Sequence, residues 1–160
     1  MNIAYLLLGS NEGDRAAALA SARAAIALAT GNILAASAVY ETASWGKTDL
    51  PPHLNQALKI ATALSAQDLL HCLQQIENSL GRVRQEKWGL RVIDIDIIFY
   101  NEDIIDSIAL KIPHPYFAQR RFVLTPLAEI APDFSDPLSK QTVGQILAQC
   151  ADPLPVQRLD

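Results

Sequence analysis

Two aspartates, Asp94 and Asp96, stand two residues apart in the stretch 92–100, which reads Val-Ile-Asp-Ile-Asp-Ile-Ile-Phe-Tyr. The β-branched residues and the alternation of apolar with acidic side chains predict a β-strand. Residues two apart on a strand point to the same face, about 6.5 Å from each other. The two carboxylates should therefore converge on one face, while four apolar residues fill the buried one: Ile93, Ile95, Ile97 and Phe99.

Two carboxylates on one strand face repel each other, and proteins usually offset this repulsion by binding a hard divalent cation between them. Mg²⁺ is the natural candidate, and two ions about 3.5 to 4 Å apart would suit phosphoryl chemistry. The alternative interpretation is a solvated face, because alternating Asp and Ile also suits a half-exposed antiparallel strand. Aspartate is nevertheless poor in strands, so the pair would weaken a purely structural strand.

A basic stretch directly precedes the aspartates. Its four cations fall within ten residues that also contain Trp88 and Gly89; they are Arg82, Arg84, Lys87 and Arg91. The planar guanidinium group of arginine can donate two hydrogen bonds to phosphate oxygens, and a metal ion neutralises the remaining charge. The basic stretch and the aspartate pair together therefore predict a polyphosphate site. Taken alone, the charge run would be an ordinary solvated loop. Arg120 and Arg121 could add positive charge to the same site.

Other phosphate and nucleophile motifs are missing from the sequence. Residues 9–13, Gly-Ser-Asn-Glu-Gly, lack the lysine of a P-loop and the third glycine of a dinucleotide fingerprint. They are interpreted as a tight turn that shapes the edge of a pocket. No signature supports a serine–histidine or cysteine–histidine nucleophile among the three histidines.

The elements that must position these residues follow a simple order. Apolar runs predict strands at 3–8, 33–41, 54–63 and 92–100, and helical patterns cover 14–30 and 65–80, with Ser65 as an N-cap and Gly31 as a stop. This βαββαβ order predicts an α+β, ferredoxin-like antiparallel sheet with both helices on one face and the other face open. Further helices are expected within 117–130 and 140–150, after a rigid turn at Pro113-His114-Pro115.

Length and composition fit one domain over residues 1–160. The chain has 160 residues, half of them hydrophobic, which is enough to bury a core without disulfides or a structural metal. Cys72 and Cys150 match no metal-ligand spacing and suit a reducing, cytoplasmic setting. The formal net charge of −4 argues against binding nucleic acid through overall charge. We expect no signal peptide, no membrane span and a monomer.

These motifs resemble the 6-hydroxymethyl-7,8-dihydropterin pyrophosphokinase family of folate biosynthesis over nearly the whole chain. The residues that carry the resemblance are Leu8-Gly9-Ser10-Asn11, Tyr40-Glu41-Thr42, Leu54-Asn55, Gly81-Arg82-Val83-Arg84, Trp88 to Ile98, Pro113-His114-Pro115 and Arg120 to Pro126. The resemblance implies a ferredoxin-like enzyme. Its reaction moves the terminal pyrophosphoryl unit of ATP to the hydroxymethyl oxygen of the pterin, and AMP is released.

The resemblance also implies a role for each matched position. Asp94 and Asp96 would hold two Mg²⁺ ions, and Arg82 and Arg91 would stabilise charge on the phosphates. The expected ATP contacts are Gln74, Glu77, Arg84, Lys87, Ile98, His114 and Arg120. The expected pterin contacts are Thr42, His53, Asn55, Trp88 and Phe122.

Three positions depart from the family's pattern: Leu90 and Ala43 replace prolines, and His53 replaces an aromatic ring that stacks on the pterin. None removes a charged group, so affinity should change more than activity. Two other functions use the same fold. A palm-type nucleotidyltransferase or cyclase also pairs aspartates, but needs more positive surface to copy nucleic acid. An RNA-binding module would place aromatics where Asp94 and Asp96 stand.

Overall fold

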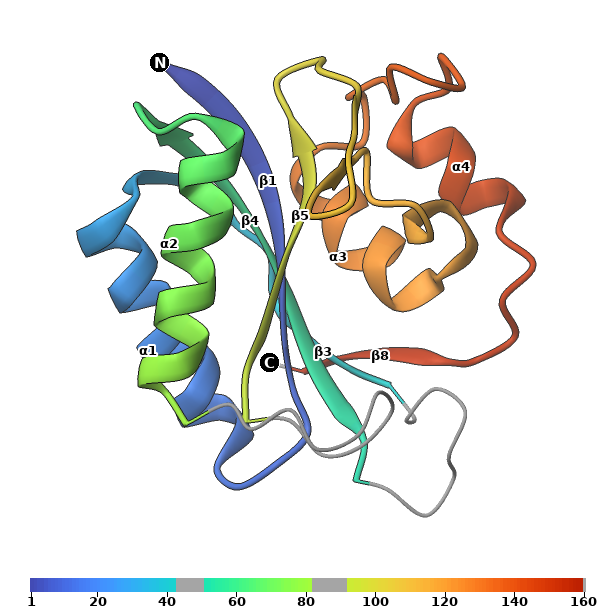
Figure 1. Ribbon diagram of the computed structural model, residues 1–160. Helices are drawn as coiled ribbons and strands as arrows, with labels where there is room; N and C mark the ends of the chain where they lie inside the picture. Colours follow the sequence, from blue (N-terminus) through green and yellow to red (C-terminus); the bar gives the residue numbers. More distant parts are fainter. Residues whose placement is uncertain (43–50, 82–91, 160) are drawn as a thin grey trace.

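The computed structural model describes residues 1–42, 51–81 and 92–159, and Figure 1 shows their arrangement. A six-stranded antiparallel sheet is built from β1 (Asn2–Ser10), β2 (Gly31–Ala36), β3 (Val39–Thr42), β4 (His53–Thr62), β5 (Asp94–Tyr100) and β8 (Val156–Leu159). The strand order is β5-β1-β4-β3-β8, and β2 pairs with β4 beside β3. This is the ferredoxin-like arrangement that the sequence predicts.

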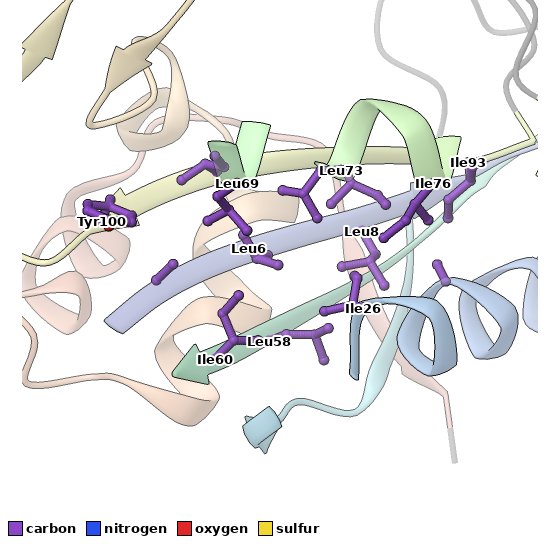
Figure 2. Packing of buried hydrophobic residues seen from close by; sticks show 14 of the residues in the cluster. Leu6, Leu8, Ile26, Leu58, Ile60, Leu69, Leu73, Ile76, Ile93 and Tyr100 are labelled. Carbon is purple, nitrogen blue, oxygen red and sulfur yellow. The ribbon is translucent and has the colours of Figure 1, made fainter. Parts of the chain in front are cut away.

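Two helices cover one face of the sheet, α1 (Arg15–Ala29) and α2 (Ala66–Ser79). Asp14 and Ser65 cap them by accepting bonds from Ala17 N and Asp68 N, both at 3.1 Å. Figure 2 shows how α2 packs Leu69, Leu73 and Ile76 onto the strands. Apolar residues at this spacing form one helical stripe, which explains why the helix buries this face.

Gly31 is the first residue of β2, just after the end of α1, and the backbone there requires glycine. Its φ is +143°, and a Cβ atom there would lie 2.1 Å from the carbonyl oxygen of Ala61. The helix therefore ends where the sequence predicts. The chain then turns, and β2 pairs with β4 from its first residue.

The second face of the sheet, expected to be open, is partly covered by the C-terminal helices. These are η1 (Phe117–Gln119), α3 (Arg121–Ile130) and α4 (Val143–Gln149), and they lie opposite α1 and α2 in Figure 1. Their buried residues form a second core with Tyr5, Leu7 and Ala57 of the sheet. The strands β6 (Ile105–Asp106) and β7 (Lys111–Ile112) form a separate small hairpin.

The predicted strand 33–41 is split into β2 and β3. Ser37 interrupts it, since its N–H donates to Ala57 O and its hydroxyl accepts from Ala57 N, both at 2.9 Å. A serine that bonds its neighbour's backbone in this way competes with the regular ladder. The two halves still run along the same edge of β4.

A bulge in β5 corrects the expected position of Phe99. Tyr5 pairs with Phe99 and Leu6 pairs with Ile97, so Ile98 is an extra residue in the ladder. Ile95 and Ile97 pack toward α2 as expected, but Phe99 packs with Ile98 in the second core. The strict alternation predicted from the sequence therefore stops at Ile98.

No helix among residues 1–42, 51–81 and 92–159 is long and apolar enough to cross a membrane.

Candidate active site

Four residues form a row across four strands on the face that carries α3. Asp94 on β5 pairs with Gly9 on β1, Gly9 pairs with Asn55 on β4, and Asn55 pairs with Tyr40 on β3. We call these four residues the Gly9 row. Directly paired residues share a face, and neighbouring strands are about 4.8 Å apart, so Asp94 and Asn55 are separated by about 10 Å. The sheet thus places an acidic group and an amide on either side of a bare glycine.

Asp96 lies on the same face as Asp94. It pairs with Leu7, whose side chain belongs to the second core under α3. Both aspartates are half-buried. The part of the chain that the structure describes contains no cluster of three or more His, Cys, Asp or Glu that could hold a metal.

Asn55 is buried, with only 3% of its surface exposed. Its Nδ2 atom donates to Leu8 O at 3.3 Å, while its Oδ1 atom has no partner among the described residues. A buried acceptor without a partner costs free energy of about 1–3 kcal/mol. An orphaned atom of this kind marks a place where a ligand could donate a hydrogen bond.

Thr42 and His53 form the second residue pair beyond that of Tyr40 and Asn55. They face each other at the ends of β3 and β4. The Thr42 hydroxyl donates to Pro155 O at 3.0 Å, and His53 Nε2 lies 3.3 Å from Asn11 Nδ2. Three of the predicted pterin contacts are therefore brought together at one end of the sheet.

His114 follows the cis peptide bond between Ile112 and Pro113. Its backbone N–H donates to Ile98 O at 3.0 Å, and its Nδ1 atom accepts from Tyr116 N at 3.2 Å. An imidazole that accepts at Nδ1 carries its proton on Nε2 when it is neutral. The ring is held as a hydrogen-bond donor.

Electrostatics keep that ring neutral. The pKa of His114 is lowered from 6.5 to about 4, chiefly by burial and then by the positive charge of Arg120, while Asp94 acts in the opposite direction. These effects require His114, Arg120 and Asp94 to be electrostatic neighbours. Asp94 of the Gly9 row thus lies near His114 and Arg120, which follow it by 20 and 26 residues in the sequence.

Arg120 stands at the N-cap position of α3 among aromatic rings. Its guanidinium carbon lies 5.2 Å from the centre of the Tyr116 ring and 5.9 Å from that of Phe122. Both distances suit cation–π contact. Tyr116, which is 54% exposed, was not identified from the sequence. The available signal was its position between the Pro113-His114-Pro115 turn and the two arginines, Arg120 and Arg121.

The other predicted ATP contacts on α2 and β5 lie at the edge of the sheet. Glu77 is buried and its Oε2 atom accepts from Ile95 N at 2.8 Å, which satisfies a backbone donor on the edge strand. Gln74 precedes it by one helical turn and is half-buried. The Ile98 side chain is buried in the second core, and its carbonyl is bonded to His114.

The predicted residues Arg82, Arg84, Lys87, Trp88 and Arg91 lie outside the described residues. So do two of the departures from the family's pattern, Ala43 and Leu90.

A ferredoxin-like sheet that gathers paired carboxylates, an arginine and a neutral histidine on one face is suited to phosphate chemistry. A sequence model of the family 7,8-dihydro-6-hydroxymethylpterin-pyrophosphokinase (HPPK) matches residues 5–132. The chain belongs to this family.

Curated relatives agree over most of their length. The protein named 2-amino-4-hydroxy-6-hydroxymethyldihydropteridine pyrophosphokinase from Methylorubrum extorquens is 45% identical over 161 residues, covering 100% of both chains. Its namesake from Bacillus subtilis is 46% identical over 133 residues, covering 81% of this chain and 78% of the relative. The Haemophilus influenzae protein of that name is 40% identical and covers 95% of each.

Solved structures share the fold. The HPPK-DHPS of Plasmodium falciparum with pteroate has a TM-score of 0.76 at 17% identity over 92% of this chain. The A437G variant with SDX-DHP has a TM-score of 0.76 at 18% identity. The chain corresponds to only 42% of each of those longer chains.

Proposed function

We propose that the protein transfers the pyrophosphoryl unit of ATP to the hydroxymethyl group of 6-hydroxymethyl-7,8-dihydropterin, giving the pterin diphosphate and AMP in folate biosynthesis. The observation that carries this proposal is the Gly9 row, which places an amide suited to a heterocycle two strands from a carboxylate suited to a phosphate-bound cation. The family match and the names of the relatives support it.

The pterin binds at the amide end of the row. Asn55 Oδ1 accepts a hydrogen bond from the pterin's polar edge, which would relieve the buried acceptor. Thr42 contacts the same edge, and the rings of His53 and Phe122 stack on the two faces of the pterin. Trp88 covers it in the closed complex. A site that hydrogen-bonds a buried heterocycle rejects analogues that leave its polar groups unpaired.

ATP binds at the carboxylate end. His114 offers its Nε2–H and Arg120 its guanidinium to phosphate oxygens; Arg84 and Lys87 add further cationic contacts. Gln74, Glu77 and Ile98 border the nucleotide at the outer edge of β5. Because the His114 ring is neutral, it can donate to phosphate without competing for a proton near neutral pH.

Asp94 and Asp96 are the ligands for Mg²⁺, two ions in our proposal. The residues fit: two half-buried carboxylates on one face provide the oxygen ligands that Mg²⁺ takes from proteins, with phosphates and water completing its shell. When bound, the metal would neutralise charge on the phosphates and help to orient them.

The reaction is a displacement at the β-phosphorus. The pterin's hydroxymethyl oxygen bonds to that phosphorus, the bond to the oxygen that bridges to the α-phosphorus breaks, and AMP leaves with the electron pair while the hydroxyl proton is released. Arg82 and Arg91 stabilise the charge that grows on the phosphates, which is the interaction that accelerates the step. By holding the polar edge of the pterin, Asn55 and Thr42 orient the attacking hydroxymethyl oxygen.

One assay tests this function. The purified protein is incubated with ATP, Mg²⁺ and the reduced hydroxymethylpterin, and AMP is resolved from ADP. We expect AMP in amounts equal to the pterin diphosphate, and only when the pterin is present. ADP as product, or AMP formed without the pterin, would refute the proposal.

We also propose that the enzyme acts as a monomer in the cytoplasm. The free thiols of Cys72 and Cys150 suit a reducing compartment. Sedimentation at working concentration tests the oligomeric state.

A further inference from the structure

The helix α3 begins with an unusual cap. Its N-cap residue is Arg120, which makes no side-chain cap. Serine, threonine, aspartate and asparagine are preferred there because their oxygens accept from the first-turn N–H groups, and arginine has no acceptor. A positive side chain at this end is also unfavourable for the helix dipole.

A carboxylate from the C-terminal segment replaces the missing cap. Asp152 Oδ2 accepts from the backbone N–H of Arg121 at 3.0 Å, across 31 residues of sequence. Asp152 is 7% exposed, and its other oxygen accepts from Leu154 N at 3.0 Å. Arg121 donates in return through Nε to Asp152 O at 3.1 Å and through Nη2 to Cys150 O at 2.8 Å.

The same segment continues to the pterin end of the sheet. The carbonyl of Pro155 accepts from the Thr42 hydroxyl at 3.0 Å, and β8 then pairs with β3, with Val156 opposite Thr42. Residues 150–159 therefore join the start of α3 to the end of β3, and Figure 1 shows this segment running from α4 to β8 beside β3. They lie beyond residue 132, where the family match ends.

We infer that Asp152 is a positioning residue for both substrates. By capping α3 where the Arg120 side chain has no acceptor to offer, it fixes the first turn, which follows Arg120 and carries Phe122. This inference rests on the proposed function, in which Arg120 contacts ATP and Phe122 stacks on the pterin. Asp152 touches neither substrate and acts through these two side chains.

The test compares the kinetics of Asp152→Ala with a matched control. Asp136 is also a buried aspartate, and its carboxylate accepts from Leu138 N at 3.0 Å and from the Ser139 hydroxyl at 2.9 Å, in a turn after α3. Asp136→Ala should destabilise the protein to a similar degree without loosening the start of α3. All variants are assayed well below their unfolding temperatures.

Asp152→Ala should raise KM for ATP and for the pterin by about 2- to 30-fold, the range that corresponds to a lost helix cap, while kcat changes little. Asp152→Asn keeps one acceptor, so its KM values should lie between those of the wild type and of Asp152→Ala. If Asp152→Ala does not fold, the test uses Asp152→Asn instead. In an Arg120→Ala background, Asp152→Ala should add little to KM for ATP, because coupled residues are not additive.

Two results would overturn the inference. If Asp152→Ala and Asp136→Ala have the same KM values, Asp152 only stabilises the fold. If Asp152→Ala raises KM for ATP as much in the Arg120→Ala background as in the wild type, Asp152 does not act through Arg120. A different failure belongs to the proposed function: if Arg120→Ala and Phe122→Ala leave both KM values unchanged, the assigned contacts are wrong, and the inference falls with them.

Discussion

Gly9 and Asn55 are directly paired on β1 and β4, and a Cβ atom at position 9 would lie 2.8 Å from Asn55 Nδ2. The bare backbone at position 9 therefore sets the orientation of the Asn55 amide, which donates to Leu8 O on the same strand as Gly9. The Leu-Gly-Ser-Asn stretch thus leaves room for the Asn55 side chain, which contacts the pterin in our proposal.

Gly9→Ala should displace the Asn55 amide and weaken pterin binding. The contact falls on the end of a flexible side chain, so we expect a stability cost at or below the low end of the usual range of about 1–3 kcal/mol for overpacking. KM for the pterin should rise by about 5- to 150-fold, the range that about 1–3 kcal/mol for an unsatisfied buried partner implies, with KM for ATP nearly unchanged. Steady-state kinetics with each substrate varied in turn will show this.

The control for this prediction is the same change in an Asn55→Ala background. There, Gly9→Ala should have no further effect on KM for the pterin. An equal further rise would mean that position 9 acts on the pterin independently of Asn55.

Asp94→Asn and Asp96→Asn should each remove nearly all turnover while the fold remains intact. The change keeps the side-chain volume but deletes the charge of a proposed metal ligand, and it replaces a half-buried carboxylate with a neutral amide. Thermal unfolding without Mg²⁺ should give an unchanged or slightly higher Tm. Substantial turnover in either variant at saturating Mg²⁺ would disprove the metal assignment.

Glu77→Ala should destabilise the protein through the edge strand. It leaves Ile95 N, which now donates to Glu77 Oε2, without a buried partner, at a cost of about 1–3 kcal/mol. Glu77→Gln keeps an acceptor at this position and should retain most of the stability in urea unfolding. Equal destabilisation by both changes would show that the charge of Glu77, and not its bond to Ile95, supports the fold.

The stability of the metal-free protein should fall as the pH falls from about 6.5 to about 4. The folded-state pKa of His114 is lowered to about 4 by burial and then by Arg120, against the opposing effect of Asp94, while the unfolded value is 6.5. Between these values the unfolded state binds the proton more strongly, so protonation favours unfolding. The contribution is at most about 3 kcal/mol and is fully present above pH 6.5.

His114→Gln should remove this part of the pH dependence in urea titrations at several pH values. A slope that persists in His114→Gln would assign it to other groups.

Local sequence signals predicted the elements well, because caps and stops act within a few residues. Ser65 begins α2 and Gly31 ends α1 as expected. The aspartate pair was placed on the correct face for the same reason, since strand periodicity is local. The bulge at Ile98 depends on the register between β1 and β5, which no pattern within β5 reveals.

Long-range pairings set the rest of the site. The Gly9 row joins residues from four strands, and the cap on α3 comes from Asp152, 31 residues after Arg121. The short strand β8 has only four residues and follows a proline, so its apolar pattern was too brief to predict a strand. The strand β8 forms because it pairs with β3.

The most direct test of the central claim is calorimetric titration of each substrate into two variants, Asn55→Ala and Asp94→Asn. The account places the pterin at Asn55 and the metal-bound phosphates at Asp94, about 10 Å apart across Gly9. We predict that Asn55→Ala binds ATP with Mg²⁺ normally but loses affinity for the pterin, and that Asp94→Asn loses affinity for ATP with Mg²⁺ but still binds the pterin. Loss of the same substrate by both variants, or a reversed pattern, would contradict the account.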